Sequence, residues 1–70
     1  MTQQTLGERR VRLGFNPGGN ETVNHIKRLS ADLIDLCEEL KADGETGRLV
    51  ALAQTHYEDA AMWAVKAATA

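Results

Sequence analysis

Residues 21–43, with the sequence ETVNHIKRLSADLIDLCEELKAD, decide the fold. Large apolar side chains recur there at alternating intervals of three and four residues: Ile26, Leu29, Leu33, Leu36 and Leu40. This heptad-like spacing places them along one side of an α-helix and predicts that they pack against a partner helix. Because Gly44 stands where a left-handed C-terminal cap is expected, we predict one helix over residues 21–43.

A second helix is predicted over residues 48–69, after a short connection at residues 44–47. A connection of this length makes the two helices antiparallel neighbours, which together form a helical hairpin. The second helix is rich in alanine, which favours helix but buries little apolar area. Further apolar side chains widen the stripe on the first helix beyond what one neighbour covers: Val23, Ile34 and Cys37. The hairpin is therefore expected to pack against copies of itself.

The chain is small for a protein that folds alone. Its 70 residues form at most one domain, and a single core of this size rarely supplies more than ~3–5 kcal/mol. One cysteine, Cys37, cannot form an internal disulfide, and no cysteine and histidine spacing suggests zinc. We therefore expect no metal and no other cofactor, and oligomerisation remains as the source of added stability.

Upstream of the hairpin the sequence predicts less regular structure. Residues 1–9 are polar and show no pattern, so they are expected to be a flexible N-terminus, with the hairpin domain spanning residues 10–70. Val11, Leu13 and Phe15 alternate with other residues and would share one side of an extended segment. The predicted class is all-α: an antiparallel two-helix hairpin with an N-terminal extended segment, assembling as an oligomer of hairpins.

Positive charge is concentrated near the N-terminus, although the net charge is −2. Residues 1–28 carry five basic and two acidic residues, whereas residues 29–70 carry three basic and eight acidic ones. This asymmetry indicates either an anion-binding region or a solvated surface. A compact anion suits the sequence pI of about 5.5 better than duplex nucleic acid does, because nucleic-acid-binding domains are usually strongly basic.

Catalysis is not predicted, because the residue types that enzymes use do not occupy suitable positions. Ser30, the one serine, falls inside a predicted helix rather than in a nucleophile elbow. His25 and His56 lie on different helices without metal-ligand spacing, so each is expected to be a surface or interface residue. No apolar run reaches the ~18 residues of a membrane span, and no signal peptide opens the chain. These features favour an intracellular protein that binds neither a membrane nor a metal.

The loop NPGGN at residues 16–20 leads into the first predicted helix and is the candidate ligand site. Asn20 is placed to cap that helix, whose N-terminal N–H groups and dipole favour a phosphate. The candidate ligand-binding residues combine a ring that can stack on a base, loop backbone and two cations: Phe15, Asn16, Gly18, Gly19, Asn20, Lys27 and Arg28. Alternatively, Phe15 covers the end of the apolar row on the helix and has a structural role only.

Trp63 and Lys66, near the end of the second helix, are further candidates. Trp63 is either an interface anchor or a ligand contact, because buried tryptophans commonly anchor protein interfaces. In a symmetric assembly Lys66 would be repeated around an axis, and such a ring of lysines would attract anions.

Four short motifs, in order along the chain, resemble the hairpin domain of phage anti-defence sponge proteins: Val11-x-x-Gly14-Phe15, Val23-Asn24-x-Ile26-Lys27, Ala53-x-Thr55 and Met62-x-x-x-Lys66-Ala67. Proteins of that family counter the bacterial CBASS and Thoeris systems by sequestering their cyclic nucleotide signals. The resemblance covers residues 10–68. It implies a compact hexamer of hairpins without catalysis, acting in the cytoplasm of the infected bacterial host.

The resemblance also implies roles for individual residues. Phe15 would stack on a base of a cyclic dinucleotide, Lys27 would hold a phosphate, and Lys66 would lie near a threefold pocket for cyclic trinucleotides. Thr55 joins the ligand-binding candidates because it belongs to the third motif. The sequence departs from the family pattern in three places: Phe15 replaces an expected tyrosine, Lys66 replaces a common arginine, and the loop at residues 16–20 is shorter than in some members.

Two other hypotheses remain open from the sequence. The first is a structural or regulatory hairpin that binds another protein through its apolar stripe and has no affinity for nucleotides. The second is a small nucleic-acid-binding protein that uses the basic arm of Arg9, Arg10 and Arg12, which would show a steep salt dependence on duplex DNA.

Overall fold

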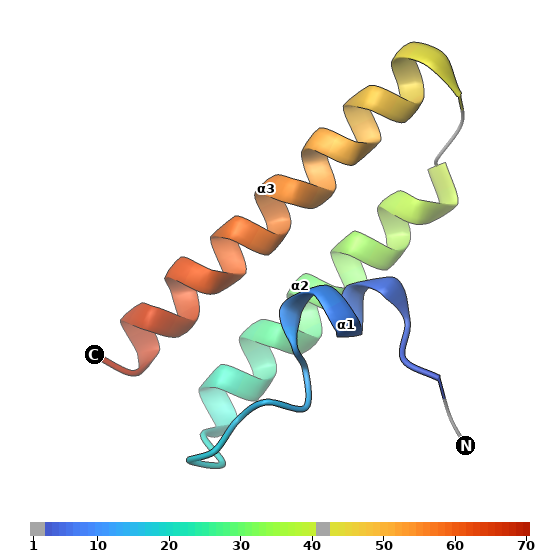
Figure 1. The fold of residues 1–70 in the computed structure, drawn as a ribbon. Coiled ribbons are helices and arrows are strands. Elements are labelled where there is room, and N and C mark those ends of the chain that lie inside the picture. The colour runs from blue at the N-terminus through green and yellow to red at the C-terminus, as the bar shows by residue number, and fades with distance from the viewer. Residues whose placement is uncertain (1–2, 41–42) are drawn as a thin grey trace.

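The computed structural model describes residues 3–40 and 43–70. Within these residues three helices and no strand are present: α1 (Leu6–Val11), α2 (Glu21–Leu40) and α3 (Gly44–Ala68). Helices α2 and α3 run antiparallel, and the short α1 lies across the middle of α2 (Figure 1). The chain measures 41 × 31 × 12 Å, so it is a flat molecule. The predicted helical hairpin is confirmed.

The predicted extended segment is wrong, because α1 is a helix. Thr5 caps it in a capping box: the Thr5 side chain accepts from Glu8 N–H at 3.1 Å, and Thr5 N–H donates to Glu8 Oε1 at 2.9 Å. The helical turn places Val11 in the core and leaves Phe15 62% exposed, so they do not share a side. The boundary expected between residues 9 and 10 falls inside α1.

Helix α1 is held against the hairpin by close packing and by charged groups. Gly7 N–H donates to Asp35 Oδ1 on α2 at 2.7 Å. Arg10 on α1 forms an ion pair with Glu58 on α3 at 2.5 Å. Apolar side chains from the three helices and from the turn after α1 pack together and form the core: Leu6, Val11, Leu13, Ala31, Ile34, Tyr57 and Ala61. The core thus includes a helix that the sequence analysis had not placed.

The helix limits agree with the prediction at one end of the hairpin and differ at the turn. Helix α2 begins at Glu21, and Asn20 caps it as predicted, because Asn20 Oδ1 accepts from Val23 N–H at 3.0 Å. Helix α3 begins at Gly44, so residues 44–47 form its first turn rather than a connection. The predicted end of the first helix includes residues 41–42, which lie outside the described residues.

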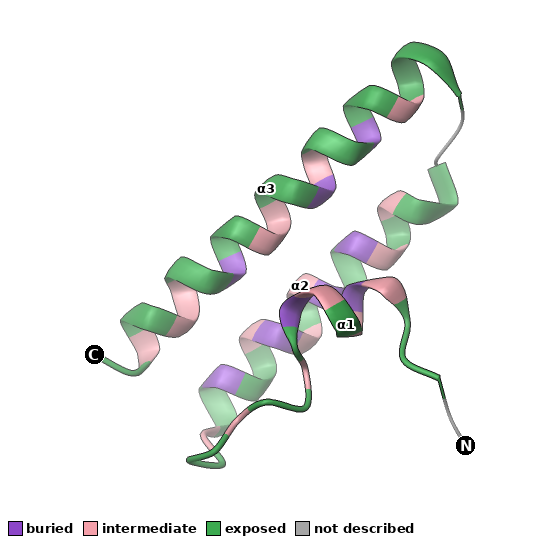
Figure 2. Cartoon of the chain, in the orientation of Figure 1, coloured by how far each residue is buried: buried purple, intermediate pink, exposed green. Residues whose placement is uncertain are grey.

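The row of leucines on α2 does not face α3. Four of them, at 29, 33, 36 and 40, are 41–63% exposed. The side of α2 that meets the rest of the chain carries a different row, which is buried: Val23, Lys27, Ala31 and Ile34. Figure 2 shows this pattern as purple on the facing sides of the helices and green on the outer sides. The leucine row is uncovered in a single chain, and its packing against another copy stays a prediction.

The buried contact between α2 and α3 includes a polar residue. Gln54, 1% exposed, donates from Nε2 to Ile34 O at 3.0 Å and to Glu38 Oε1 at 2.9 Å. Cys37, which the sequence places on the widened apolar stripe of α2, is partly buried. Among the described helices, none is long and apolar enough to cross a membrane.

Candidate functional site

The α1–α2 loop, residues 12–20, is held in shape by its own hydrogen bonds. Asn16 Nδ2 donates to Asn20 O at 2.8 Å, while Asn16 Oδ1 accepts from Asn20 N–H at 3.2 Å. Gly19 takes a positive φ of 61° and donates its N–H to Asn16 O at 3.0 Å, a conformation that glycine adopts without strain. The loop therefore has a defined shape before any ligand arrives.

The loop begins where α1 ends, in a Schellman motif. Arg12 N–H donates to Arg9 O at 3.3 Å, and Leu13 N–H donates to Glu8 O at 3.0 Å. Arg12 occupies the left-handed position of this motif, with φ of 56°. It is the one non-glycine residue with a positive φ in the described part of the chain. Glycine or asparagine is usual at such a position, so an arginine is uncommon there.

Lys27 ties the loop to α2 from inside the fold. Its side chain is buried, with the residue 6% exposed, and Nζ donates to Arg12 O at 2.9 Å and to Phe15 O. The same Nζ lies 5.6 Å from the centroid of the Phe15 ring, a cation–π contact. Burial lowers the pKa of Lys27, and the nearby Arg12 lowers it further. Lys27 is thus a buried cation that organises the backbone around Phe15.

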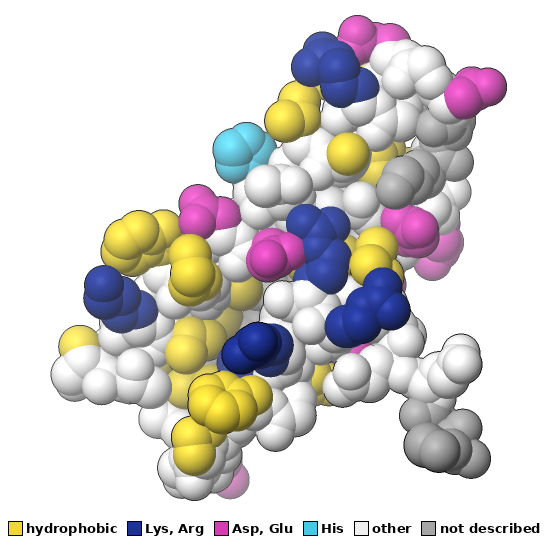
Figure 3. Space-filling model, viewed as in Figure 1, with side chains coloured by type: hydrophobic (Ala, Val, Ile, Leu, Met, Phe, Trp, Pro, Cys, Tyr) yellow, Lys and Arg dark blue, Asp and Glu magenta, His cyan; other side chains and the backbone are white. Residues whose placement is uncertain are grey.

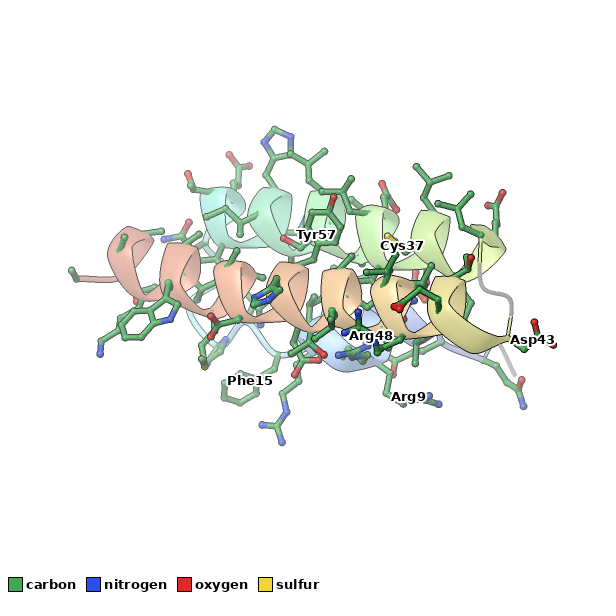
Figure 4. The ribbon with its side chains drawn as sticks, turned by 90° about the horizontal axis from the view of Figure 1, so that it is seen from above. Arg9, Phe15, Cys37, Asp43, Arg48 and Tyr57 are labelled. Atoms are coloured by element: carbon green, nitrogen blue, oxygen red, sulfur yellow. The ribbon has the colours of Figure 1, made fainter. Side chains whose placement is uncertain are left out.

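Two open grooves adjoin this buried lysine. The loop groove, about 590 Å³, lies between the α1–α2 loop and the end of α3. The α1–α3 groove, about 640 Å³, has Arg10, Val11 and Arg12 on one side and α3 on the other. Lys27 and Val65 line both grooves. Figure 3 shows Lys and Arg side chains beside exposed hydrophobic ones on this face, and in Figure 4 Phe15 projects away from the helices.

The structure brings most of the predicted site residues together. The loop groove is lined by five of them: Phe15, Asn16, Gly18, Asn20 and Lys27. Gly19 belongs to the same loop, and Thr55 lines the neighbouring α1–α3 groove. The Asn20 side chain accepts from the Val23 N–H at the start of α2. One backbone donor fewer is therefore available to a ligand there than the sequence indicates.

Three predicted site residues lie elsewhere. Arg28 points to carboxylates, with Nη1 2.9 Å from Glu8 Oε2 and Nη2 3.0 Å from Asp32 Oδ1. These contacts raise the pKa of Arg28, chiefly through the hydrogen bond to Glu8, so its charge is committed within the fold. Trp63 and Lys66 line neither groove; both are exposed, and Lys66 Nζ lies 5.1 Å from the Trp63 ring centroid.

Arg12 and Val65 line the grooves but were not predicted as site residues. Arg12 was treated as part of a basic arm, because its left-handed backbone cannot be read from the sequence. The described residues contain no group of three His, Cys, Asp or Glu side chains that could hold a metal ion.

The fold and the site together define a small three-helix domain built on an antiparallel hairpin, with a preformed loop beside a buried cation. The profile of the Acb2/Tad1 hairpin domain matches residues 7–69 of the chain. The chain therefore belongs to the Acb2/Tad1 hairpin-domain family, which is the anti-CBASS and anti-Thoeris sponge family. The resemblance seen in the sequence motifs is confirmed, and the family is known for binding rather than catalysis. Comparison with curated proteins and with solved structures gave no significant match.

Proposed function

We propose that the protein is a non-enzymatic sponge that binds cyclic oligonucleotide immune signals and withholds them from bacterial effectors of the CBASS type. The family membership of residues 7–69 supports this proposal. A phage protein with this role would act in the cytoplasm of the infected cell. Cyclic dinucleotides are its first expected ligands, and cyclic trinucleotides are a second class to be tested.

The observation that carries the proposal is the pairing of Phe15 with Lys27. A 62% exposed ring stands over a buried ammonium group 5.6 Å away, at the edge of the loop groove. A nucleotide offers a base that can stack on such a ring, which Lys27 holds in place, and phosphates that the positive charge around the ring attracts. The groove volume of about 590 Å³ lies within the range of about 300–1,000 Å³ typical of small-molecule sites.

A single chain leaves the groove open, so we propose that the ligand is enclosed between copies. The molecule is 12 Å thick, and its leucine row is uncovered. Burial of that row between copies would supply stability that a thin core lacks. The family implies a hexamer, and each loop groove would then be closed by a neighbouring protomer.

A sponge acts by mass action, so it must bind tightly. A Kd of 1 nM corresponds to about −12 kcal/mol. Stacking contributes about 1–3 kcal/mol for each base, and charge-assisted phosphate contacts add about 1.5–3 kcal/mol each. Two bases and two phosphates would therefore contribute about 5–12 kcal/mol, so nanomolar binding needs the upper end of this range and further contacts from a second protomer.

The test is isothermal titration calorimetry with a panel of cyclic dinucleotides and trinucleotides, each with its linear counterpart as control. We expect tight binding of at least one cyclic ligand and weak binding of its linear form. Ligand recovered after denaturation should be chemically unchanged by chromatography. Absence of binding across the panel would overturn the proposed function, and recovery of linear product would overturn its non-enzymatic character.

The exposed leucine row also suits a second hypothesis, a hairpin that binds another protein. That hypothesis predicts no heat of binding with any nucleotide and an assembly that phosphate competitors leave unchanged. The same titrations therefore separate the two hypotheses.

A further inference from the structure

We propose that Arg12 is a ligand-contacting residue that supplies the free positive charge of the site, while Lys27 positions the loop. The inference rests on the proposed function and extends its site from the loop groove into the adjoining α1–α3 groove, which Arg12 lines and which shares Lys27 and Val65 with the loop groove.

Lys27 has few donors left for a ligand. An ammonium group carries three protons, and two are directed at Arg12 O and Phe15 O. The group is also buried and lies beside the Phe15 ring, so contact with a phosphate would break bonds that hold the loop. Lys27 therefore contributes mainly by fixing the place of Phe15 and of the Arg12 backbone.

Arg12 differs from most arginines of the chain in having its charge uncommitted. Arg10, Arg28 and Arg48 form ion pairs with glutamates. Within residues 3–40 and 43–70 no carboxylate pairs with Arg12, whose side chain is exposed and lines the α1–α3 groove. The opposite wall carries Glu58, which is occupied by Arg10, and Asp59. An anion in this groove is therefore expected at the Arg12 end.

The backbone of Arg12 strengthens the assignment. Its φ of 56° lies in the region that glycine and asparagine tolerate best, at the left-handed position of the Schellman motif that ends α1. Glycine or asparagine would adopt this backbone at lower cost, so the local backbone does not account for the arginine. A guanidinium at this position can make two parallel hydrogen bonds to one phosphate, which an ammonium cannot.

The experiment compares Arg12→Asn, Arg12→Lys and the control Arg9→Ala. Asparagine tolerates the left-handed backbone, so Arg12→Asn should melt at or above the temperature of the parent. Arg9 is an exposed arginine on α1 that lines neither groove, so Arg9→Ala matches the loss of charge. Affinity is measured by calorimetry with cyclic di-AMP, cyclic di-GMP and cyclic GMP-AMP.

We expect Arg12→Asn to weaken binding of the preferred ligand roughly 10- to 100-fold, as the loss of charge-assisted hydrogen bonds does. Arg12→Lys should recover part of that loss, and Arg9→Ala should stay within about 2-fold of the parent, because screened distant charges contribute little. Parental affinity in Arg12→Asn, or an equal loss in Arg9→Ala, would overturn the assignment of Arg12. A parent that binds none of the three ligands while binding a cyclic trinucleotide would overturn the dinucleotide site; a parent that binds nothing would overturn the proposed function itself.

Discussion

Gly7 marks the closest approach of α1 to α2, and Gly7→Ala tests the position of α1. An ideal Cβ on Gly7 would lie 2.1 Å from Ala31 O and less than 3.0 Å from the carbonyl carbon and Cα of the same residue. All three are backbone atoms in the middle of α2, which is close-packed and cannot move aside locally. The methyl group must therefore push α1 away from α2.

The size of the effect follows from what α1 loses when it moves. The hydrogen bond from Gly7 N–H to the Asp35 carboxylate is worth about 1.5–3 kcal/mol. Partial exposure of Val11 costs a share of the roughly 1.5–3 kcal/mol that its burial provides. Alanine favours helix over glycine by about 1 kcal/mol, which offsets part of the loss. We expect a net loss of about 2–3 kcal/mol, or roughly 10–20 °C in melting temperature for a domain of this size.

The assay is urea unfolding followed by circular dichroism at one fixed protein concentration, because assembly makes stability depend on concentration. Gly14→Ala is the matched control, since a Cβ at Gly14 meets no heavy atom within 4 Å. The control should stay within about 0.5 kcal/mol of the parent. If Gly7→Ala is as stable as Gly14→Ala, α1 does not pack on α2 as described and the reasoning fails.

Three further predictions concern the ring, the first cap and the leucine row. Phe15→Ala should weaken cyclic dinucleotide binding by about 1–3 kcal/mol in calorimetry, because a stacking platform is lost. The pKa of Glu8 is lowered from 4.5, first by the hydrogen bond from Thr5 N–H and then by Arg28. The contribution of Glu8 to stability is therefore complete above pH 4.5 and is lost as the pH falls through the lower pKa of the folded state. Acid unfolding of Glu8→Gln should lack that part of the pH dependence. Leu33→Lys should shift the protein to smaller species in light scattering, because it places a charge on the uncovered row.

The ring and the leucine row have matched control variants, and each of the three predictions has an outcome that would contradict it. Phe15→Leu keeps an apolar side chain without a ring, so it should also lose affinity if stacking is what the ring provides. Parental affinity in Phe15→Ala would exclude stacking at this position. Unchanged acid unfolding in Glu8→Gln would mean that other carboxylates govern it. Asn24→Lys adds the same charge on the opposite side of α2 from Leu33, because nine residues complete two and a half turns. Equal dissociation in both lysine variants would rule out the leucine row as the specific interface.

The hairpin was predictable because its signals are local. The N-cap at Asn20 and the heptad-like row of apolar residues need only the spacing of neighbours in the sequence. The capping box of Thr5 and Glu8 is equally local, but the alternation of Val11, Leu13 and Phe15 was read as an extended segment. A pattern of three alternating residues fits a strand, whereas the cap shows where the helix actually begins.

The direction that α2 faces was not predictable, because it depends on how closely backbones approach. The leucine row is the more hydrophobic side, yet the buried side carries Ala31, whose small side chain lets Gly7 approach. Gln54 of α3 is buried against α2 and makes two hydrogen bonds to it. Periodicity identifies both stripes but does not say which one the same chain covers.

Lys27 is a predicted site residue that the structure also uses to hold the loop. The sequence and the family resemblance marked it as a phosphate ligand, and the structure places it at the grooves. Its bonds to Arg12 O and Phe15 O depend on a loop that folds back over α2, which no local pattern encodes. The positive φ of Arg12 is held both by the local Schellman bonds at the end of α1 and by the bond from Lys27 to its carbonyl oxygen.

These features connect the marginal core with the proposed binding site. The bonds of Lys27 and the Asn16–Asn20 pair hold the loop before a ligand arrives, so little conformational entropy is lost on binding. The groove is open in a single chain, and if another copy covers it as proposed, ligand binding and assembly would be thermodynamically linked. A cyclic nucleotide should then stabilise the assembly as well as occupy it, and loss of the leucine contacts should weaken ligand binding even though no leucine of that row lines the loop groove.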